Sequence, residues 1–166
     1  VFLTTAEDLT VECDGAGNTA ALQNWLDTYA GATAEDVCGD FTWSHDFEGL
    51  TDDCGATGSR TVTFTATDEC GNDSNTSATF TIEDTTNPFI DTVASDQTVE
   101  CDVAGNTEAL NAWLANNGGA VSIDNCGDVT VTLTFEEIPG DVEGSYTLNL
   151  IYTATDDAGN SVSQVV

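Results

Sequence analysis

Paired carboxylates stand at the ends of three Thr-rich segments, where they could together bind a divalent cation. The pairs are Asp68-Glu69, Glu83-Asp84 and Asp156-Asp157. Calcium is a hard cation that takes about six to eight oxygen ligands from carboxylates and carbonyls. In a β-sandwich, the ends of the first two segments could meet at one pole, next to the following domain. We therefore expect a Ca²⁺ site there; the open alternative is that these are ordinary acidic turn residues.

The overall charge agrees with a cation-binding protein and excludes several partners. The 166 residues include 30 acidic residues and one basic residue, Arg60, which gives a formal net charge of −29. Nucleic acid binding needs clustered Lys and Arg, and an anionic membrane surface would repel this chain. No run of about 20 apolar residues is present to insert into a membrane. Salt or bound divalent cations would reduce the self-repulsion, although the acidity could also serve solubility alone.

An internal repeat organises the chain. At an offset of 88 residues, 32 of 78 aligned positions are identical without a gap. Residues 10–14 match 98–102, and residues 65–68 match 153–156. Such self-similarity indicates two copies of one fold, which we place at residues 1–87 and 88–166. The polar linker before Pro88 is expected to be stiff, and the second copy ends before an equivalent of residues 79–84, so its last strand is truncated.

Alternation of Thr with apolar residues predicts the strands, and turns rich in Gly, Asn and Asp separate them. The predicted strands are 9–13, 41–47, 61–67 and 76–83, with 97–101, 129–135 and 148–155 in the second copy. A short helix is predicted at residues 18–26, and Leu110, Trp113 and Leu114 repeat its apolar positions. The predicted fold is all-β: two tandem Ig-like antiparallel β-sandwich domains, each with one short helix after the first Cys-bearing strand. The Trp residue of each helix is expected to seal the core, with a sugar platform as the alternative.

The repeat also suggests how the six cysteines pair. Cys13 and Cys38 recur as Cys101 and Cys126, whereas Cys54 and Cys70 are both replaced in the second copy. If partners are kept or lost together, the bridges are Cys13–Cys38, Cys54–Cys70 and Cys101–Cys126. Each would stabilise its domain by roughly 3 kcal/mol and would indicate an oxidising, extracellular environment. Zinc is excluded because no C-x₂₋₄-C pair occurs and His45 is the only His.

Catalytic residues are not indicated. Ser44, His45 and Asp46 are the residue types of a triad, but neighbouring residues in a strand point to opposite faces. We therefore expect no enzyme. Trp43 and Tyr29 are instead candidates for contacting a glycan, and only the first copy has aromatic residues at these positions.

Together these motifs resemble the HYR-like, immunoglobulin-type repeats of giant secreted proteins from Bacteroidetes, especially Flavobacteria. The resemblance covers nearly the whole chain and rests on residues 10–13, the Trp25 helix, Cys38-Gly39, residues 65–72 and the linker 83–88. It implies a secreted cell-surface adhesin, gliding-motility filament or extracellular fibre. The implied partners are further copies of the repeat, in the same chain or in neighbouring subunits.

The expected function is therefore a structural repeat module of a bacterial cell-surface filament, stalk or adhesin, stapled by disulfides and stiffened by Ca²⁺. The alternative is a module that binds surface glycans through Trp43 or Tyr29 of the first copy. Thr85 and Thr92 lie in short motifs that resemble the O-glycan acceptors of Bacteroidetes, although such motifs often occur by chance and plain linker chemistry explains them better.

Overall fold

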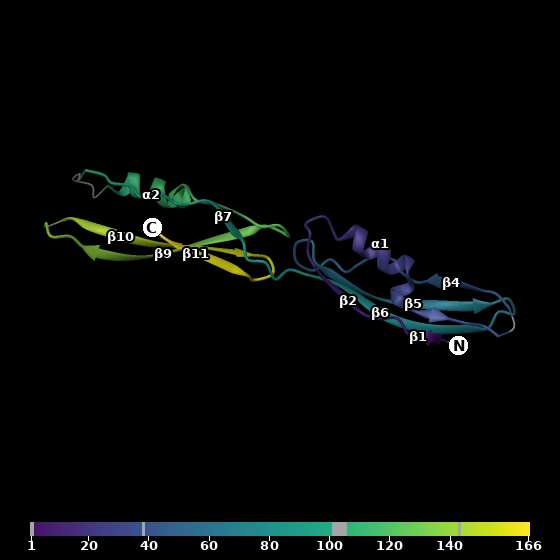
Figure 1. The fold of residues 1–166 in the computed structure, drawn as a ribbon. Helices are drawn as coiled ribbons and strands as arrows, with labels where there is room; N and C mark the ends of the chain where they lie inside the picture. The colour runs from purple at the N-terminus through teal and green to yellow at the C-terminus, as the bar shows by residue number, and fades with distance from the viewer. Residues whose placement is uncertain (1, 38, 101–105, 143) are drawn as a thin grey trace. The chain divides into compact units, whose positions relative to one another are not determined.

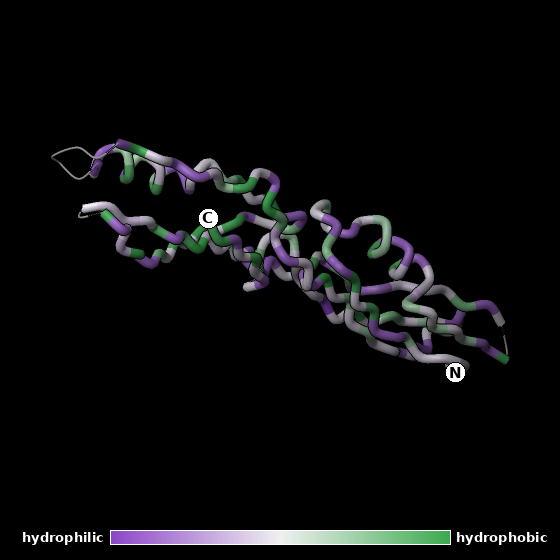
Figure 2. The backbone as a smooth tube through the Cα atoms, turned by 60° about the vertical axis from the view of Figure 1, so that its left-hand side comes forward, coloured by the Kyte–Doolittle hydropathy of each residue, from purple (hydrophilic) through white to green (hydrophobic). Residues whose placement is uncertain are grey.

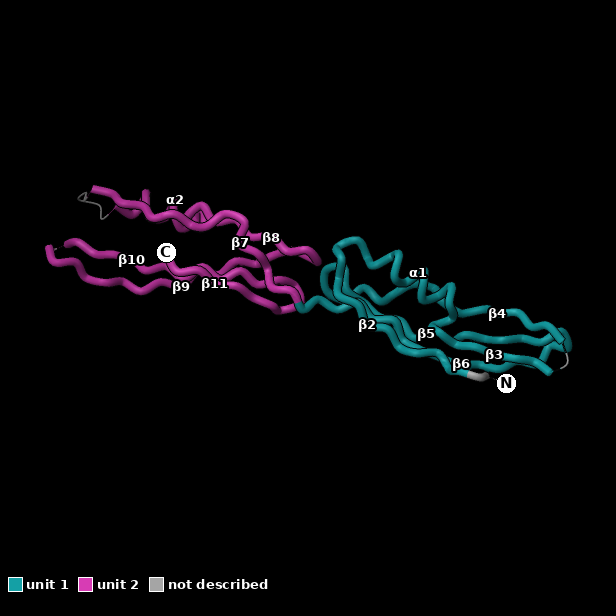
Figure 3. The backbone as a smooth tube through the Cα atoms, viewed as in Figure 1, with its two compact units in different colours: residues 1–85 teal, residues 86–166 magenta. Residues whose placement is uncertain are grey.

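The computed structural model describes residues 2–37, 39–100, 106–142 and 144–166. The chain divides into two compact units, unit 1 at Val1–Thr85 and unit 2 at Thr86–Val166 (Figure 3). Both units are mostly β-structure with one short helix. Among the described residues, no helix is long and apolar enough to cross a membrane.

Unit 1 has a four-stranded sheet, a two-stranded sheet and a helix. The larger sheet has the strand order β2-β6-β5-β4, and β1 pairs with β3. Helix α1 lies over one face of the larger sheet (Figure 1). The elements are β1 (Phe2–Thr4), β2 (Leu9–Glu12), α1 (Thr19–Asp27), the 3₁₀ turn η1 (Tyr29–Gly31), β3 (Thr33–Ala34), β4 (Phe41–His45), β5 (Gly58–Asp68) and β6 (Asp73–Glu83).

The core of unit 1 lies between α1 and the two long strands. Val62, Phe64 and Phe80 are fully buried, and Trp25 of α1 is only 4% exposed. The Trp25 ring packs against Phe64 and Phe80 with centroids 5.4 and 5.5 Å away. Burial of each such side chain contributes about 1.5–3 kcal/mol. Buried and more exposed positions alternate along β5 and β6, as a half-buried sheet requires. Figure 2 shows the hydropathy of the residues along the backbone.

Unit 2 repeats this plan with a smaller sheet. Its larger sheet has the order β11-β10-β9, and β7 pairs with β8. Leu150, Tyr152 and Ala154 of β10 are fully buried. The elements are β7 (Phe89–Thr92), α2 (Thr107–Ala115), the 3₁₀ turn η2 (Asn117–Gly119), β8 (Val121–Ile123), β9 (Val129–Pro139), β10 (Tyr146–Asp156) and β11 (Ser161–Val165).

The two units share specific side-chain contacts at positions 88 residues apart. Trp25 Nε1 donates to Glu7 O at 3.0 Å, and Trp113 Nε1 donates to Ser95 O at 3.0 Å. Before each helix, an Asn in a left-handed conformation donates its side-chain amide to a backbone carbonyl of the preceding segment. These bonds join Asn18 to Glu12 O (2.8 Å) and Asn106 to Glu100 O (2.6 Å). Equivalent residues therefore anchor each helix in the same way.

Two features differ from the sequence-based expectation. Strand β2 runs parallel to β6, from Leu9↔Phe80 to Glu12↔Glu83, so the sheet is not purely antiparallel. Residues 97–100 were predicted to be a strand, but these described residues adopt no strand conformation. In unit 1 the equivalent residues pair with β6, whereas no described strand of unit 2 pairs with residues 97–100.

Candidate functional site

An acidic pair in unit 2 is the best-formed candidate site for a cation. Asp124 follows β8 and Asp156 ends β10, and the two side chains bring carboxylate oxygens within 4.8 Å of each other. Asp156 is only 6% exposed. Two like charges at this separation repel each other strongly when shielded from water, so the pair needs a compensating group.

In each of the two carboxylates, only one oxygen accepts a hydrogen bond from the described residues. Asp124 Oδ2 accepts a hydrogen bond from the Cys126 N–H at 2.7 Å, and Asp156 Oδ1 accepts one from the Asn160 N–H at 2.8 Å. The other oxygens, Asp124 Oδ1 and Asp156 Oδ2, are buried without a hydrogen-bond partner among the described residues. Leaving such atoms unsatisfied is costly. A hard cation with oxygen ligands, such as Ca²⁺, fits this pair of donors.

The equivalent residues of unit 1 are arranged differently. Asp36 and Asp68 line one small cavity of about 160 Å³. Asp68 Oδ1 accepts from the backbone N–H groups of Cys70 (2.8 Å) and Asn72 (2.9 Å), and Asp68 Oδ2 accepts from the Asn72 amide at 2.7 Å. These bonds, the Asn72 amide foremost, lower the pKa of Asp68. Both oxygens of Asp68 are thus satisfied by the protein, unlike those of Asp156.

The predicted carboxylates of unit 1 do not meet. Strands β5 and β6 form an antiparallel pair from Thr67↔Asp73 to Gly58↔Ile82. Asp68 and Glu69 therefore lie at one end of the sheet, and Glu83 and Asp84 leave from the other, about 33 Å away at 3.3 Å per residue. The expectation that they converge at one pole was wrong because consecutive strands of a hairpin end at opposite poles.

In unit 2 the carboxylate that lies close to Asp156 is that of Asp124, not that of the adjacent Asp157. Asp157 is exposed, and its Oδ2 accepts from the Asp128 N–H at 3.3 Å. Sequence reasoning missed Asp124, although a signal existed: Asp36 and Asp124 are identical at the repeat offset and each stands two residues before a repeated Cys.

The cysteines agree only partly with the predicted bridges. Cys13 and Cys126 are disulfide-bonded and buried. Their predicted partners, Cys38 and Cys101, lie outside the described residues, so those two pairings stay predictions. The Cys13 N–H donates to Glu83 O at 2.8 Å, so Cys13 lies at the end of the sheet where β6 finishes. Gly39 lies near Glu69, at the opposite end of the sheet, because a Cβ atom at Gly39 would be 3.5 Å from Glu69 Oε2.

The predicted Cys54–Cys70 bridge is absent. Both residues are free and exposed. They flank opposite ends of β5, an 11-residue strand about 33 Å long. Bonded cysteines require Cα atoms about 4.4–6.8 Å apart. The prediction was wrong because joint loss from the second copy does not make two cysteines neighbours.

The predicted glycan-binding aromatics pack against each other. The rings of Tyr29 and Trp43 are stacked, with centroids 4.6 Å apart and an interplanar angle of 12°. Phe41 also contacts Trp43 edge-on at 6.2 Å. Both candidate residues are half-buried. One ring face of each is therefore already covered, which leaves less platform than two exposed aromatics would offer.

The two predicted acceptor threonines are exposed. The Thr85 hydroxyl donates to Glu12 Oε2 at 2.9 Å, and the Thr85 N–H donates to Glu12 Oε1 at the same distance. The Thr92 hydroxyl donates to Asp91 Oδ2 at 3.4 Å. Their glycosylation stays a prediction.

The triad-like residues of β4 are engaged with the backbone. His45 Nδ1 accepts from the Phe47 N–H at 3.3 Å, and Asp46 Oδ1 accepts from the Thr63 N–H at 2.7 Å. The first bond is local to the end of β4, the second joins that end to β5, and neither belongs to a Ser–His–Asp relay.

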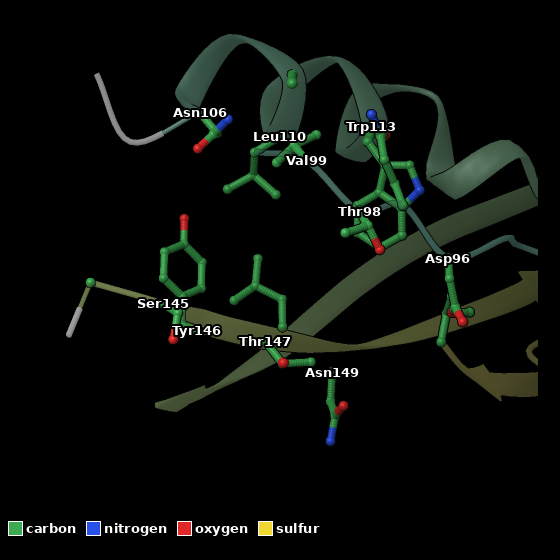
Figure 4. Close-up of a pocket in the computed structure, with 15 residues that line it drawn as sticks. Asp96, Thr98, Val99, Asn106, Leu110, Trp113, Ser145, Tyr146, Thr147 and Asn149 are labelled. Carbon is green, nitrogen blue, oxygen red and sulfur yellow. The ribbon is translucent and has the colours of Figure 1, made fainter. Parts of the chain in front are cut away.

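Unit 2 also contains an open cavity of about 550 Å³ between α2 and β10. Leu110 and Trp113 project from α2 toward the sheet, and Tyr146 projects from β10 toward the helix (Figure 4). Among the described residues that line it, Asp96 is the only acidic one. The other described side chains of the lining are uncharged, and they include both polar and apolar residues.

No protein-family model and no curated protein matches this chain. Among solved structures, similarity is found to the protocadherin gamma B7 EC3-6 cis-dimer (14% identity, TM-score 0.31, covering 100% of this chain and 45% of that chain). PcdhgB3 EC1-4 gives 14% identity and a TM-score of 0.32, covering 100% and 48%. Extracellular cadherin domains 1-4 of protocadherin gamma B7 give 18% and 0.29, covering 80% and 41%. This chain spans less than half of each. TM-scores of this size do not establish a shared fold.

Proposed function

We propose that the chain is a non-enzymatic structural module of an extracellular bacterial surface filament, stalk or adhesin. The observation that carries the proposal is the repeated construction of the two units. Equivalent Trp and Asn residues make the same hydrogen bonds to the preceding segment in each unit. Repetition of a whole architecture is typical of proteins that build length by adding modules.

The chemistry of the chain supports an extracellular site of action. The bonded Cys13 and Cys126 indicate an oxidising environment, because cytosolic thiols are kept reduced. The bacterial surface assignment rests on the resemblance to HYR-like repeats. The net charge of −29 makes nucleic acids and anionic membranes unfavourable partners.

Calcium binding is part of the proposal. The orphan oxygens of Asp124 and Asp156 offer two ligand atoms in unit 2. Backbone carbonyls and water would supply the remaining ligands, since Ca²⁺ accepts both. The bound ion would balance the charge of the two carboxylates and hold the end of β10 against the segment after β8. The linker residues Glu83 and Asp84 stay predicted ligands.

Immunogold electron microscopy with an antibody raised against this chain tests the proposal. Gold particles along fibres or tethers outside the cell are the expected result. Labelling confined to the cell interior would refute the extracellular role. A non-reducing gel of the surface fraction provides the matching biochemical check, because reduction should change the mobility of a bridged protein.

Glycan adhesion through unit 1 is the alternative. It depends on the ring faces of Trp43 and Tyr29 that their mutual stacking leaves uncovered. A glycan array with the native chain and with Trp43→Ala tests it. Signals that disappear in the variant would support adhesion, and signals that are absent or unchanged would remove Trp43 from any binding role.

A further inference from the structure

The two carboxylates of the unit 2 site are held in place by different means. Asp156 ends β10 and begins a hydrogen-bonded hairpin turn. Its N–H donates to Asn160 O at 3.1 Å, its carbonyl accepts from the Gly159 N–H at 3.2 Å, and its Oδ1 accepts from the Asn160 N–H at 2.8 Å. The sheet itself therefore fixes Asp156. Asp124 instead follows β8, a strand of only three residues, and enters an irregular segment.

The Asp124 carboxylate is oriented through Cys126. Asp124 Oδ2 accepts from the Cys126 N–H at 2.7 Å, which is the local hydrogen bond of an Asx turn. Asp124 Oδ1 is the oxygen that has no hydrogen-bond partner among the described residues. Cys126 is 5% exposed and disulfide-bonded, so its backbone has little freedom to move. The bridge thus fixes the N–H group that orients one of the two cation ligands.

Such an orienting hydrogen bond matters for metal affinity. Groups that hydrogen-bond to a metal-binding carboxylate fix its orientation, and their loss typically weakens metal binding by about 10–100-fold. When the bridge is broken, the Cys126 N–H loses its covalent anchor. Asp124 then has more conformational freedom to lose on binding an ion, which lowers the affinity. Asp156 keeps its hairpin contacts in either state.

We propose that the disulfide of Cys126 sets the Ca²⁺ affinity of the Asp124–Asp156 site, so that the bridged protein binds the ion and reduction weakens binding. The inference rests on the proposed Ca²⁺ site and adds its regulation. The reductant is a dithiol. Its two electrons and two protons pass to the bridged cysteines, the protein S–S bond becomes two thiols, and the dithiol closes into its own disulfide. Because the two equilibria are linked, Ca²⁺ protects the bridge from reduction by the same factor.

Calorimetric titration of the full chain with CaCl₂ in about 0.15 M salt measures the affinity. The binding that is lost in Asp156→Asn defines the signal of the site. Cys126→Ala removes the bridge but keeps the N–H that donates to Asp124. We expect its Kd for Ca²⁺ to rise about tenfold or more. Cys70→Ala is the matched control, because Cys70 is free and exposed, and its Kd should equal that of the native chain.

The reduction potential of the Cys126 bridge in the native chain gives a second measurement, which needs no substitution. The chain is equilibrated with mixtures of reduced and oxidised dithiothreitol, alkylated and digested, and the Cys126 peptide is quantified by mass spectrometry. A tenfold ratio of affinities makes the potential about 30 mV more negative in saturating Ca²⁺ than in EGTA. Asp156→Asn should lose this difference, whereas Asp157→Asn, at an exposed position, should keep it.

The outcomes separate this inference from the Ca²⁺ site on which it rests. Equal potentials in Ca²⁺ and in EGTA, in a native chain that binds Ca²⁺ through Asp156, refute the role of the Cys126 bridge and leave the site standing. A weakened Cys126→Ala does not rescue it, since the loss then comes from the substitution. If Cys126→Ala does not fold, the potentials alone decide. If Asp156→Asn binds Ca²⁺ as the native chain does, the site and this inference are both wrong. The immunogold result is independent of all these outcomes.

Discussion

The indole ring of Trp25 packs against the phenyl ring of Phe80 with their centroids 5.5 Å apart. Trp25 comes from α1 and Phe80 from β6, so this contact joins the helix to the far half of the sheet. In unit 2 the equivalent helix residue is Trp113, which is half-buried, whereas Trp25 is only 4% exposed. Both indole N–H groups donate to a backbone carbonyl of the segment before the helix, so the two helices are anchored alike although their Trp side chains differ in burial.

Replacement of Phe80 with Ala should destabilise unit 1 severely. The side chain is fully buried, and loss of a buried Phe costs about 3–5 kcal/mol in transfer free energy and cavity formation. Urea unfolding monitored by Trp fluorescence should show an early transition for unit 1. The transition of unit 2 should not move.

Phe135→Ala is the matched control, because Phe135 is 61% exposed on β9. A change of less than about 0.5 kcal/mol is expected for such a surface position. Equal effects of the two substitutions would contradict the packing of Trp25 on Phe80.

The long strands and the helices could be predicted from the sequence because their patterns are local. Thr-apolar alternation marked β5, β6, β9 and β10, and the spacing of Leu22, Trp25 and Leu26 marked α1. The short strands β1, β3, β7 and β8 were missed, since two to four residues carry too little periodicity. The parallel pairing of β2 with β6 joins segments about 70 residues apart and depends on tertiary packing.

The candidate site was predicted only in part for the same reason. Asp156 was identified as an acidic strand end, but its partner Asp124 lies 32 positions earlier, after a short strand that the sequence did not reveal. The Cys54–Cys70 error has a related origin. The joint presence of Cys54 and Cys70 in one repeat does not show that they are close in space. They lie beyond opposite ends of the extended strand β5, which keeps them apart.

Cys54 and Cys70 should not be joined to each other in the native protein. Alkylation without reduction, followed by digestion and mass spectrometry, should label both residues, because both are free and exposed. Cys13 and Cys126 should resist alkylation, since they are buried and disulfide-bonded. The same digest identifies the partners of Cys13 and Cys126. A peptide linking Cys54 to Cys70 would contradict the extended 11-residue strand β5 that separates them.

The contribution of Asp68 to stability should disappear in acid. Hydrogen bonds from Asn72 and from the backbone of Cys70 hold the pKa of Asp68 below its usual value of 3.8. A carboxyl group with a lowered folded-state pKa stabilises the protein above the unfolded pKa and loses this effect as pH falls through the folded pKa. The stability difference between the native chain and Asp68→Ala should therefore be constant above about pH 5 and shrink below about pH 4.

Comparing the native chain with the variant at the same pH removes the general effect of neutralising the other carboxylates. Asp73→Ala serves as the control, because Asp73 is exposed and its Oδ1 accepts from the Thr67 hydroxyl at the same hairpin. A difference for Asp68→Ala that grows as the pH falls would contradict the sign of the lowered pKa.

Calcium should stabilise unit 2 through Asp124 and Asp156. With free Ca²⁺ at about 100 times its Kd, binding to the folded state alone adds about 2.7 kcal/mol, or roughly 10–20 °C in Tm for a unit of this size. Asp156→Asn should abolish this shift, because it removes one of the two carboxylates that face the site. Asp157→Asn changes an exposed neighbour and should leave the Tm in Ca²⁺ and the Tm in EGTA unchanged. Asp84→Asn tests whether the predicted linker ligand contributes to the Ca²⁺-dependent shift in Tm. Identical melting in Ca²⁺ and in EGTA would refute the site.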